Sequence, residues 1–194
     1  MKVPDRENDN VFLDAVQGLI AGDFSRLEPL FDDRSDAGGH DCRIIEWYEA
    51  DRFANQPKAL DEALTCACFL GRTGVVDYLM AHGADPADGA GTGMNGFHWA
   101  ANRGQFDVVR LLISRRVPLE TRDMHGGTVL GTAVWSAINE PGQDHVRIIE
   151  ALIKAGAQGD DTGYPTGNER VDEVFRRAGV VSNNPPDPGV PDQL

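Results

Sequence analysis

The sequence predicts an all-α solenoid built from helix pairs stacked in one direction. A 19-residue stretch recurs without a gap at a spacing of 33 residues, and within each copy apolar residues return at helical spacing. The hydrophobic fraction of 41% is enough for a packed core, yet no apolar run reaches the length of about 18 residues that a membrane-spanning helix needs. We therefore expect a short repeat protein of about four uneven helix-turn-helix units.

The clearest copies of the repeat are residues 62–80 and 95–113. They read EALTCACFLGRTGVVDYLM and NGFHWAANRGQFDVVRLLI, with Gly71 and Gly104 lying 33 residues apart. A glycine in the left-handed conformation ends a helix at no steric cost, and the Val-Val and Leu/Met pairs that follow form the buried stripe of a second helix. Each copy thus predicts two helices joined by a tight turn, which bury their apolar faces only by stacking on a neighbour.

Two less regular copies flank this pair. The third, within residues 128–157, has about seven extra residues at 138–145, and Pro141-Gly142 predicts an enlarged loop there between its two helices. A divergent copy opens the chain at residues 11–34, where Pro29 should shorten or kink the second helix.

A second insertion, residues 35–56, separates the first copy from the next. Its apolar centre, Ile44 to Tyr48, favours a short helix packed as a lid on the stack over an exposed contact loop. The expected organisation is a terminal extension, a repeat domain with these two insertions, a capping turn and helix, and a disordered proline-containing tail. These parts span residues 1–10, 11–160, 161–179 and 180–194.

The two clear copies resemble the ankyrin repeat, whose consensus runs T-P-L-H-x-A-A, then glycine, V-V-x-x-L-L and G-A-D. The closing signature is present as Gly83-Ala84-Asp85 in the first copy and degraded to Val117-Pro118-Leu119 in the second. The resemblance implies that His98, the histidine of the turn, is buried and hydrogen-bonded to the backbone of an adjacent loop rather than catalytic. It also implies a concave binding groove lined by loop tips and by the first helix of each repeat.

Alignment of the copies places several large side chains on that groove. The positions just before the helix-ending residue, together with the neighbouring loop tips, are rich in aromatic, methionine and arginine side chains, which are common in binding sites. For Trp99 and Trp135 the competing interpretation is a core residue. The candidate binding residues are Phe69, Leu70, Met94, Trp99, Asn102, Arg103, Met124, His125 and Trp135.

Charge narrows the choice of partner. The chain has 18 basic and 31 acidic residues, a net charge of −13, which argues against nucleic acid and against an anionic membrane surface. A basic protein or a cationic ligand is compatible with this charge, and the chain could neutralise a basic toxin or enzyme in the manner of an immunity protein. The charge is equally compatible with a purely solubilising role. Two acidic clusters, Asp32-Asp33 with Asp36 and Asp160-Asp161, are interpreted as solvated surface charge.

No motif in the sequence indicates catalysis. We expect no cofactor, no metal site and no catalytic residue. We expect the three cysteines, Cys42, Cys66 and Cys68, to be reduced, and the protein to be a monomer in the cytoplasm. The preferred hypothesis is a non-enzymatic module that binds a protein partner in the groove. The alternative is an enzyme or small-molecule-binding protein with a pocket between groove and insertions. Its polar lining would be Glu46, His98, Asn102, Arg103 and His125.

Overall fold

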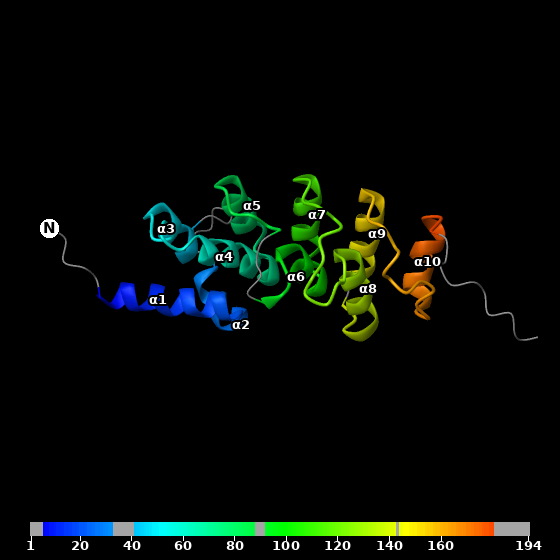
Figure 1. Ribbon diagram of the computed structural model, residues 1–194, viewed down its shortest axis with the longest axis horizontal. Helices are drawn as coiled ribbons and strands as arrows, with labels where there is room; N and C mark the ends of the chain where they lie inside the picture. Colours follow the sequence, from blue (N-terminus) through cyan, green and yellow to red (C-terminus); the bar gives the residue numbers. More distant parts are fainter. Residues whose placement is uncertain (1–5, 33–40, 88–91, 143, 181–194) are drawn as a thin grey trace, which may run out of the picture.

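The computed structural model describes residues 6–32, 41–87, 92–142 and 144–180. Within these ranges the regular elements are helices, apart from one isolated β-bridge between Arg122 and Thr128. The helix pairs follow one another in one direction, from α1 and α2 at one end of the stack to α10 at the other (Figure 1). The predicted all-α repeat solenoid is therefore confirmed.

Three consecutive helix pairs form the centre of the row. Their first helices, α4, α6 and α8, lie next to one another, and their second helices, α5, α7 and α9, form the outer layer (Figure 1). The pairs are α4 (Pro57–Leu70) with α5 (Thr73–Ala81), α6 (Gly96–Asn102) with α7 (Phe106–Ser114), and α8 (Val129–Asn139) with α9 (His145–Ala155).

The helix ends follow from single residues. Gly71 and Gly104 both have a φ of +74°, in the left-handed region where glycine carries no Cβ penalty, and each turns the chain into the next helix. At the other end, the side chains of Asn95 and Thr128 accept hydrogen bonds from the first backbone N–H groups of α6 and α8.

The insertion in the third repeat differs from the expected loop over residues 138–145. Helix α8 continues through Asn139, so the loop spans only residues 140–144. Ala137 stands where the preceding repeats have Gly71 and Gly104, and without a glycine to stop it the helix runs on for another turn. The insertion thus both lengthens α8 and forms the loop.

The N-terminal pair is α1 (Arg6–Ala21) and α2 (Phe24–Leu27). Helix α1 begins inside the segment 1–10 that was expected to be an extension, so that extension is shorter than predicted. Helix α2 passes into a 3₁₀ turn, Glu28–Leu30, which contains Pro29. The second helix is short, as expected from a proline that cannot donate to a helical hydrogen bond.

Residues of the first insertion form helix α3 (Arg43–Glu49), which packs on the N-terminal end of the stack. Ile44, Ile45 and Trp47 are buried, and the Trp47 ring lies 5.2 Å from that of Phe12 in an edge-to-face contact. The short helix predicted in this insertion is present, and its apolar side covers α1.

Helix α10 (Glu169–Arg177) covers the other end of the stack beside α9 (Figure 1). Asn168 accepts hydrogen bonds from the first N–H groups of α10, while Val171, Val174 and Phe175 are buried. The expected disordered tail, residues 180–194, lies outside the described residues except for Val180.

Candidate binding groove

A groove with a volume of about 950 Å³ runs along the first helices of the central repeats. Its walls come from the ends of α4, α6 and α8 and from the loops that precede α8 and α10. Ligand sites in proteins span about 300–1,000 Å³, so the groove could hold a peptide segment or a small molecule. It is lined by Phe69, Met94, Trp99, Asn102, Arg103, Asp123, His125, Gly127, Gly131, Thr132, Val134, Trp135, Ile138, Asn139, Glu140, Asp161, Thr162 and Gly163.

One aromatic surface of the groove is built by Trp99 and Phe69. Their rings meet edge to face with centroids 5.2 Å apart, and Trp99 also contacts the buried ring of Phe24 at 6.2 Å. The indole Nε1 of Trp99 donates to the hydroxyl of Thr92 at 2.8 Å, which fixes the ring. Trp99 is half-buried and lines the groove, so both interpretations of this residue describe part of its environment.

Arg103 brings a cation to this surface. Its guanidinium carbon lies 4.9 Å from the centroid of the Phe69 ring, within the range of a cation–π contact. The side chain is exposed, and no ion pair with another described residue is recorded for it. Its charge is therefore available to a bound molecule.

A second apolar surface lies near the C-terminal end of α8. Trp135 is 53% exposed and Ile138, one turn later, is 39% exposed, and both line the groove. Large exposed apolar side chains on the wall of a concave site are typical of binding surfaces. Because Ile138 belongs to the additional turn, the insertion contributes directly to the groove.

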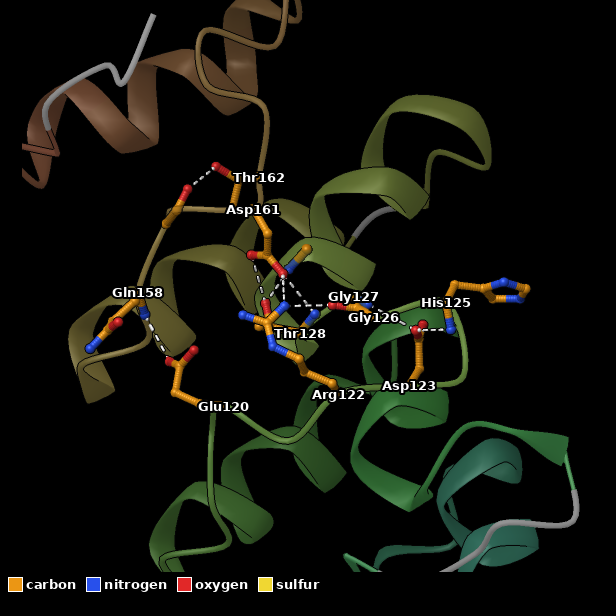
Figure 2. A network of polar contacts seen from close by, with 12 residues as sticks. Glu120, Arg122, Asp123, His125, Gly126, Gly127, Thr128, Gln158, Asp161 and Thr162 are labelled. Atoms are coloured by element: carbon orange, nitrogen blue, oxygen red, sulfur yellow. Dashed lines mark hydrogen bonds and ion pairs between the residues drawn. The ribbon is translucent and has the colours of Figure 1, made fainter.

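The loop before α8 is held by its own carboxylate. Asp123 Oδ1 accepts from the backbone N–H groups of His125 at 2.8 Å and Gly127 at 2.9 Å. Figure 2 shows the imidazole of His125 pointing away from this network. The loop is thus rigidly formed, and the His125 ring projects from it as an exposed group.

Asp161 joins the loop before α10 to the start of α8 (Figure 2). Its carboxylate accepts from the backbone N–H of Thr128 at 2.9 Å and from the Thr128 hydroxyl at 3.0 Å, and it pairs with Arg122 at 3.5 Å. A Cβ at Gly131 would lie 3.3 Å from a carboxylate oxygen of Asp161. Gly131 stands where the preceding repeat has His98, and the missing side chain leaves room for the carboxylate.

The interpretation of Asp161 as solvated surface charge is therefore wrong. Its side chain is only 24% exposed and bonds the residue that begins α8. The same contact exists one repeat earlier, where the Asn95 amide donates to the Thr121 hydroxyl at 3.3 Å. Asp161 occupies the position equivalent to Thr121 when the seven inserted residues are added to the repeat length of 33. This alignment is the feature of the sequence that could have identified the structural role of Asp161.

His98 is fully buried and has a structural environment. Its Nε2 lies 3.2 Å from the carbonyl oxygen of Gly127 in the next loop, and its Nδ1 lies 2.8 Å from Oδ1 of Asn95. Burial lowers the pKa of the imidazole, against the opposing effect of the hydrogen bond to Gly127. The expected hydrogen bond to an adjacent loop is confirmed.

The groove brings together seven of the nine predicted binding residues. The exceptions are Leu70, which packs half-buried against the core, and Met124, which is 70% exposed and lies over Gly93. Of the polar set proposed for an enclosed pocket, Asn102, Arg103 and His125 line the groove. His98 is buried behind it, and Glu46 forms an ion pair with Arg43 on the distant helix α3.

Sequence reasoning missed the far wall of the groove. Ile138 and Asn139, at the end of α8, fall where the sequence predicts a loop, and Glu140 begins the loop that follows. Among the described residues, no group of three or more His, Cys, Asp or Glu side chains is placed to hold a metal ion. None of the described helices combines the length and the hydropathy that a membrane span requires.

Comparison with known proteins agrees with the repeat architecture. Residues 64–163 match the family described as ankyrin repeats in three copies, which is more than half of the chain. No curated protein matches the chain. The matched range begins within α4 and covers the rest of the three central helix pairs and the loop that carries Asp161, and the chain belongs to the ankyrin-repeat family.

Proposed function

We propose that this chain is a non-enzymatic protein-binding module that holds its partner in the groove. The observation that carries the proposal is the pairing of two aromatic surfaces, Trp135 on α8 and the Phe69–Trp99 pair on α4 and α6, along one open cavity. Ankyrin repeats generally mediate protein interactions, and aromatic and arginine side chains supply much of the affinity in protein interfaces.

The partner is expected to place an apolar segment against these rings. Trp135 is half-exposed on a helix and Trp99 is fixed by Thr92, so the surfaces are formed before binding and little ordering is needed. The net charge of −13 favours a partner with a basic face, because complementary charge accelerates encounter. These features support a protein partner for the groove.

The test is quantitative affinity capture with wild-type protein and the variants Trp135→Ala and Arg103→Glu. Two matched controls alter similar side chains away from the groove, Ile20→Ala on α1 and Arg110→Glu on α7, both of which are exposed. A partner retained by wild type and both controls is then purified, and its affinity is measured. Trp135→Ala is expected to weaken binding by about 30-fold, corresponding to about 2 kcal/mol. If the groove variants bind as tightly as the controls, the proposed site is wrong.

A small-molecule ligand is the second candidate, favoured by the groove volume of about 950 Å³ and its aromatic lining. The two candidates separate in a thermal-shift screen of metabolites against wild type and Trp135→Ala. A ligand that stabilises wild type, leaves the variant unshifted and prevents capture of the protein partner would favour the second function. A ligand that stabilises wild type and Trp135→Ala equally would bind outside the groove.

A further inference from the structure

The chain beyond α10 starts beside the groove. Val180, the last described residue, lies against Gly159: a Cβ on that glycine would be 3.3 Å from a Val180 methyl carbon. The carbonyl of Gly159 in turn accepts from the hydroxyl of Thr162 at 2.7 Å, and Thr162 lines the groove. Val180, after which residues 181–194 continue the chain, therefore lies close to the groove wall.

The sequence of this tail has a regular spacing. Proline stands at positions 185, 188 and 191, every third residue. A polyproline II segment has three residues per turn, so prolines with this spacing share one face and repeat about every 9 Å. Proline-rich segments bind aromatic-lined grooves in this way, and the preset conformation reduces the entropy lost on binding.

The aromatic surfaces of the groove lie on neighbouring helices. One lies on α8 and the other on α4 and α6, and packed neighbouring helices are about 8–10 Å apart. A segment entering from the Thr162 side meets Trp135 first and the Phe69–Trp99 pair next. The fourteen residues of the tail span about 43 Å at 3.1 Å per residue, which is ample for this path.

Charge agrees with this direction. The tail has two acidic residues, Asp187 and Asp192, and no basic one. Arg103 stands at the Phe69 end of the groove, with its guanidinium on the ring. A tail running from Trp135 towards Phe69 with Pro188 on the Phe69–Trp99 pair brings Asp187, which precedes Pro188, towards this cation.

We infer that residues 185–191 of this chain occupy the groove as an internal competitor of the partner, with Pro185 on Trp135 and Pro188 on the Phe69–Trp99 pair. The inference rests on the proposed function, since it assigns a regulator to the same site. A partner binds the groove after displacing the tail, so replacement of the spaced prolines strengthens partner binding without changing the groove.

The test uses the full chain with a nitroxide on Gln193→Cys. The native thiols of Cys42, Cys66 and Cys68 are buried, so the new thiol is the one that reacts. Indole ¹⁵N–¹H signals of the three tryptophans are compared with the label oxidised and reduced. Trp99 and Trp135 are expected to lose intensity, while Trp47, at the other end of the stack, keeps its signal (Figure 1).

The matched controls lie in the tail itself. Pro185→Ala, Pro188→Ala and Pro191→Ala together should restore the Trp99 and Trp135 signals, whereas Pro186→Ala, which is off the three-residue spacing, should not. Unchanged signals in the labelled wild type, or equal loss in the triple variant, would overturn the inference. Signal loss in unlabelled ¹⁵N protein mixed with labelled unenriched protein would show docking onto a second copy and overturn its intramolecular form.

The two proposals can fail separately. If the tail does not dock but Trp135→Ala still weakens partner binding, the groove is a partner site without an internal competitor. If the tail docks and the partner is insensitive to Trp135→Ala and Arg103→Glu, the proposed function is wrong and the tail is an intramolecular brace.

Discussion

The imidazole of His145 donates from Nε2 to the backbone carbonyl of Asn102 at 2.9 Å, joining the second helix of one repeat to the first helix of the repeat before it. The backbone N–H of Gly142 donates to the other ring nitrogen, Nδ1, at 2.9 Å. Since Nδ1 accepts, Nε2 carries the proton and donates. One buried neutral imidazole thus holds both the repeat interface and the insertion loop.

The same position serves the same purpose in the neighbouring repeat. Gln105 begins the second helix there, and its Nε2 donates to the carbonyl of Phe69 at 3.0 Å. Phe69 and Asn102 are equivalent positions, 33 residues apart. The inter-repeat hydrogen bond is therefore a property of the repeat geometry, and glutamine and histidine are two ways of supplying its donor.

Replacing His145 tests this equivalence. His145→Ala removes the donor to Asn102 and the acceptor for Gly142, and should lower the free energy of unfolding by about 1–3 kcal/mol. His145→Gln restores the donor used by Gln105 and should recover part of that loss. The measurement is urea unfolding followed by far-UV circular dichroism. Equal stability of the two variants would contradict a specific hydrogen bond.

Replacing Asp161 should lower the free energy of unfolding more than replacing an exposed acidic residue. Asp161→Ala leaves the backbone N–H and hydroxyl of Thr128 without their partner, at an expected cost of about 2 kcal/mol for charged hydrogen bonds, reduced by its partial exposure. Glu150→Ala on the exposed side of α9 is the control, with an effect within about 0.5 kcal/mol. If both variants unfold at the same urea concentration, the carboxylate is not a structural link.

Gly131 provides a separate test of the same contact. A methyl group there would crowd the Asp161 carboxylate at 3.3 Å and force it back by a few tenths of an ångström. Gly131 also lies inside α8, where alanine is favoured over glycine by about 1 kcal/mol. Gly131→Ala is therefore expected to be nearly neutral alone and stabilising in an Asp161→Ala background. Additive effects in a double-mutant cycle would contradict the contact.

The fold was accessible from the sequence because its determinants are local. Gly71 and Gly104 mark the turns, and the Val-Val pairs mark the buried side of each second helix. The end of α8 was missed because a helix without a terminating glycine continues until other interactions stop it. The inserted residues were counted as loop when two of them belong to the helix.

The groove was accessible only in part, for a different reason. Aligned repeats place Phe69, Asn102 and Trp135 on one surface, since equivalent positions lie side by side. The far wall depends on the path of two irregular segments, the extended α8 and the loop of Asp161, which the repeat consensus does not describe. Irregular segments also carry what is particular to this chain, and they form much of the site.

The two groove tryptophans should separate binding from stability. Trp135 is 53% exposed, so Trp135→Ala should change the free energy of unfolding by less than about 0.5 kcal/mol. Trp99 packs on Phe69 and Phe24 and bonds Thr92, so Trp99→Ala should cost about 3 kcal/mol. Thermal unfolding of both variants checks this contrast. A large loss for Trp135→Ala would mean that the ring is part of the core and unsuitable as a binding probe.

The buried cysteines give a prediction on reactivity. Cys66 and Cys68 lie inside α4, and burial raises the pKa of both thiols, so the reactive thiolate is scarce in the folded chain. At pH 8 iodoacetamide should leave the native protein unmodified and alkylate it in denaturing urea, as mass spectrometry would report. The exposed thiol of the Gln193→Cys variant is the positive control. Native alkylation at the rate of that control would contradict the packing of α4 against α6.

The same shift links stability to alkaline pH. An unfolded thiol ionises near pH 9.0, whereas the buried thiols stay protonated, so unfolding releases protons and becomes more favourable as the pH rises through that value. The contribution is fully present below pH 9.0 and is lost above it. Cys68→Ala places the residue of the equivalent position, Ala101, in this helix and should weaken the decline in urea midpoint between pH 8 and 10. Lysine and tyrosine titrate alike in wild type and in Cys68→Ala, so the difference between the two slopes of urea midpoint against pH reports the thiol. Identical slopes would mean that Cys68 ionises as readily in the folded as in the unfolded chain.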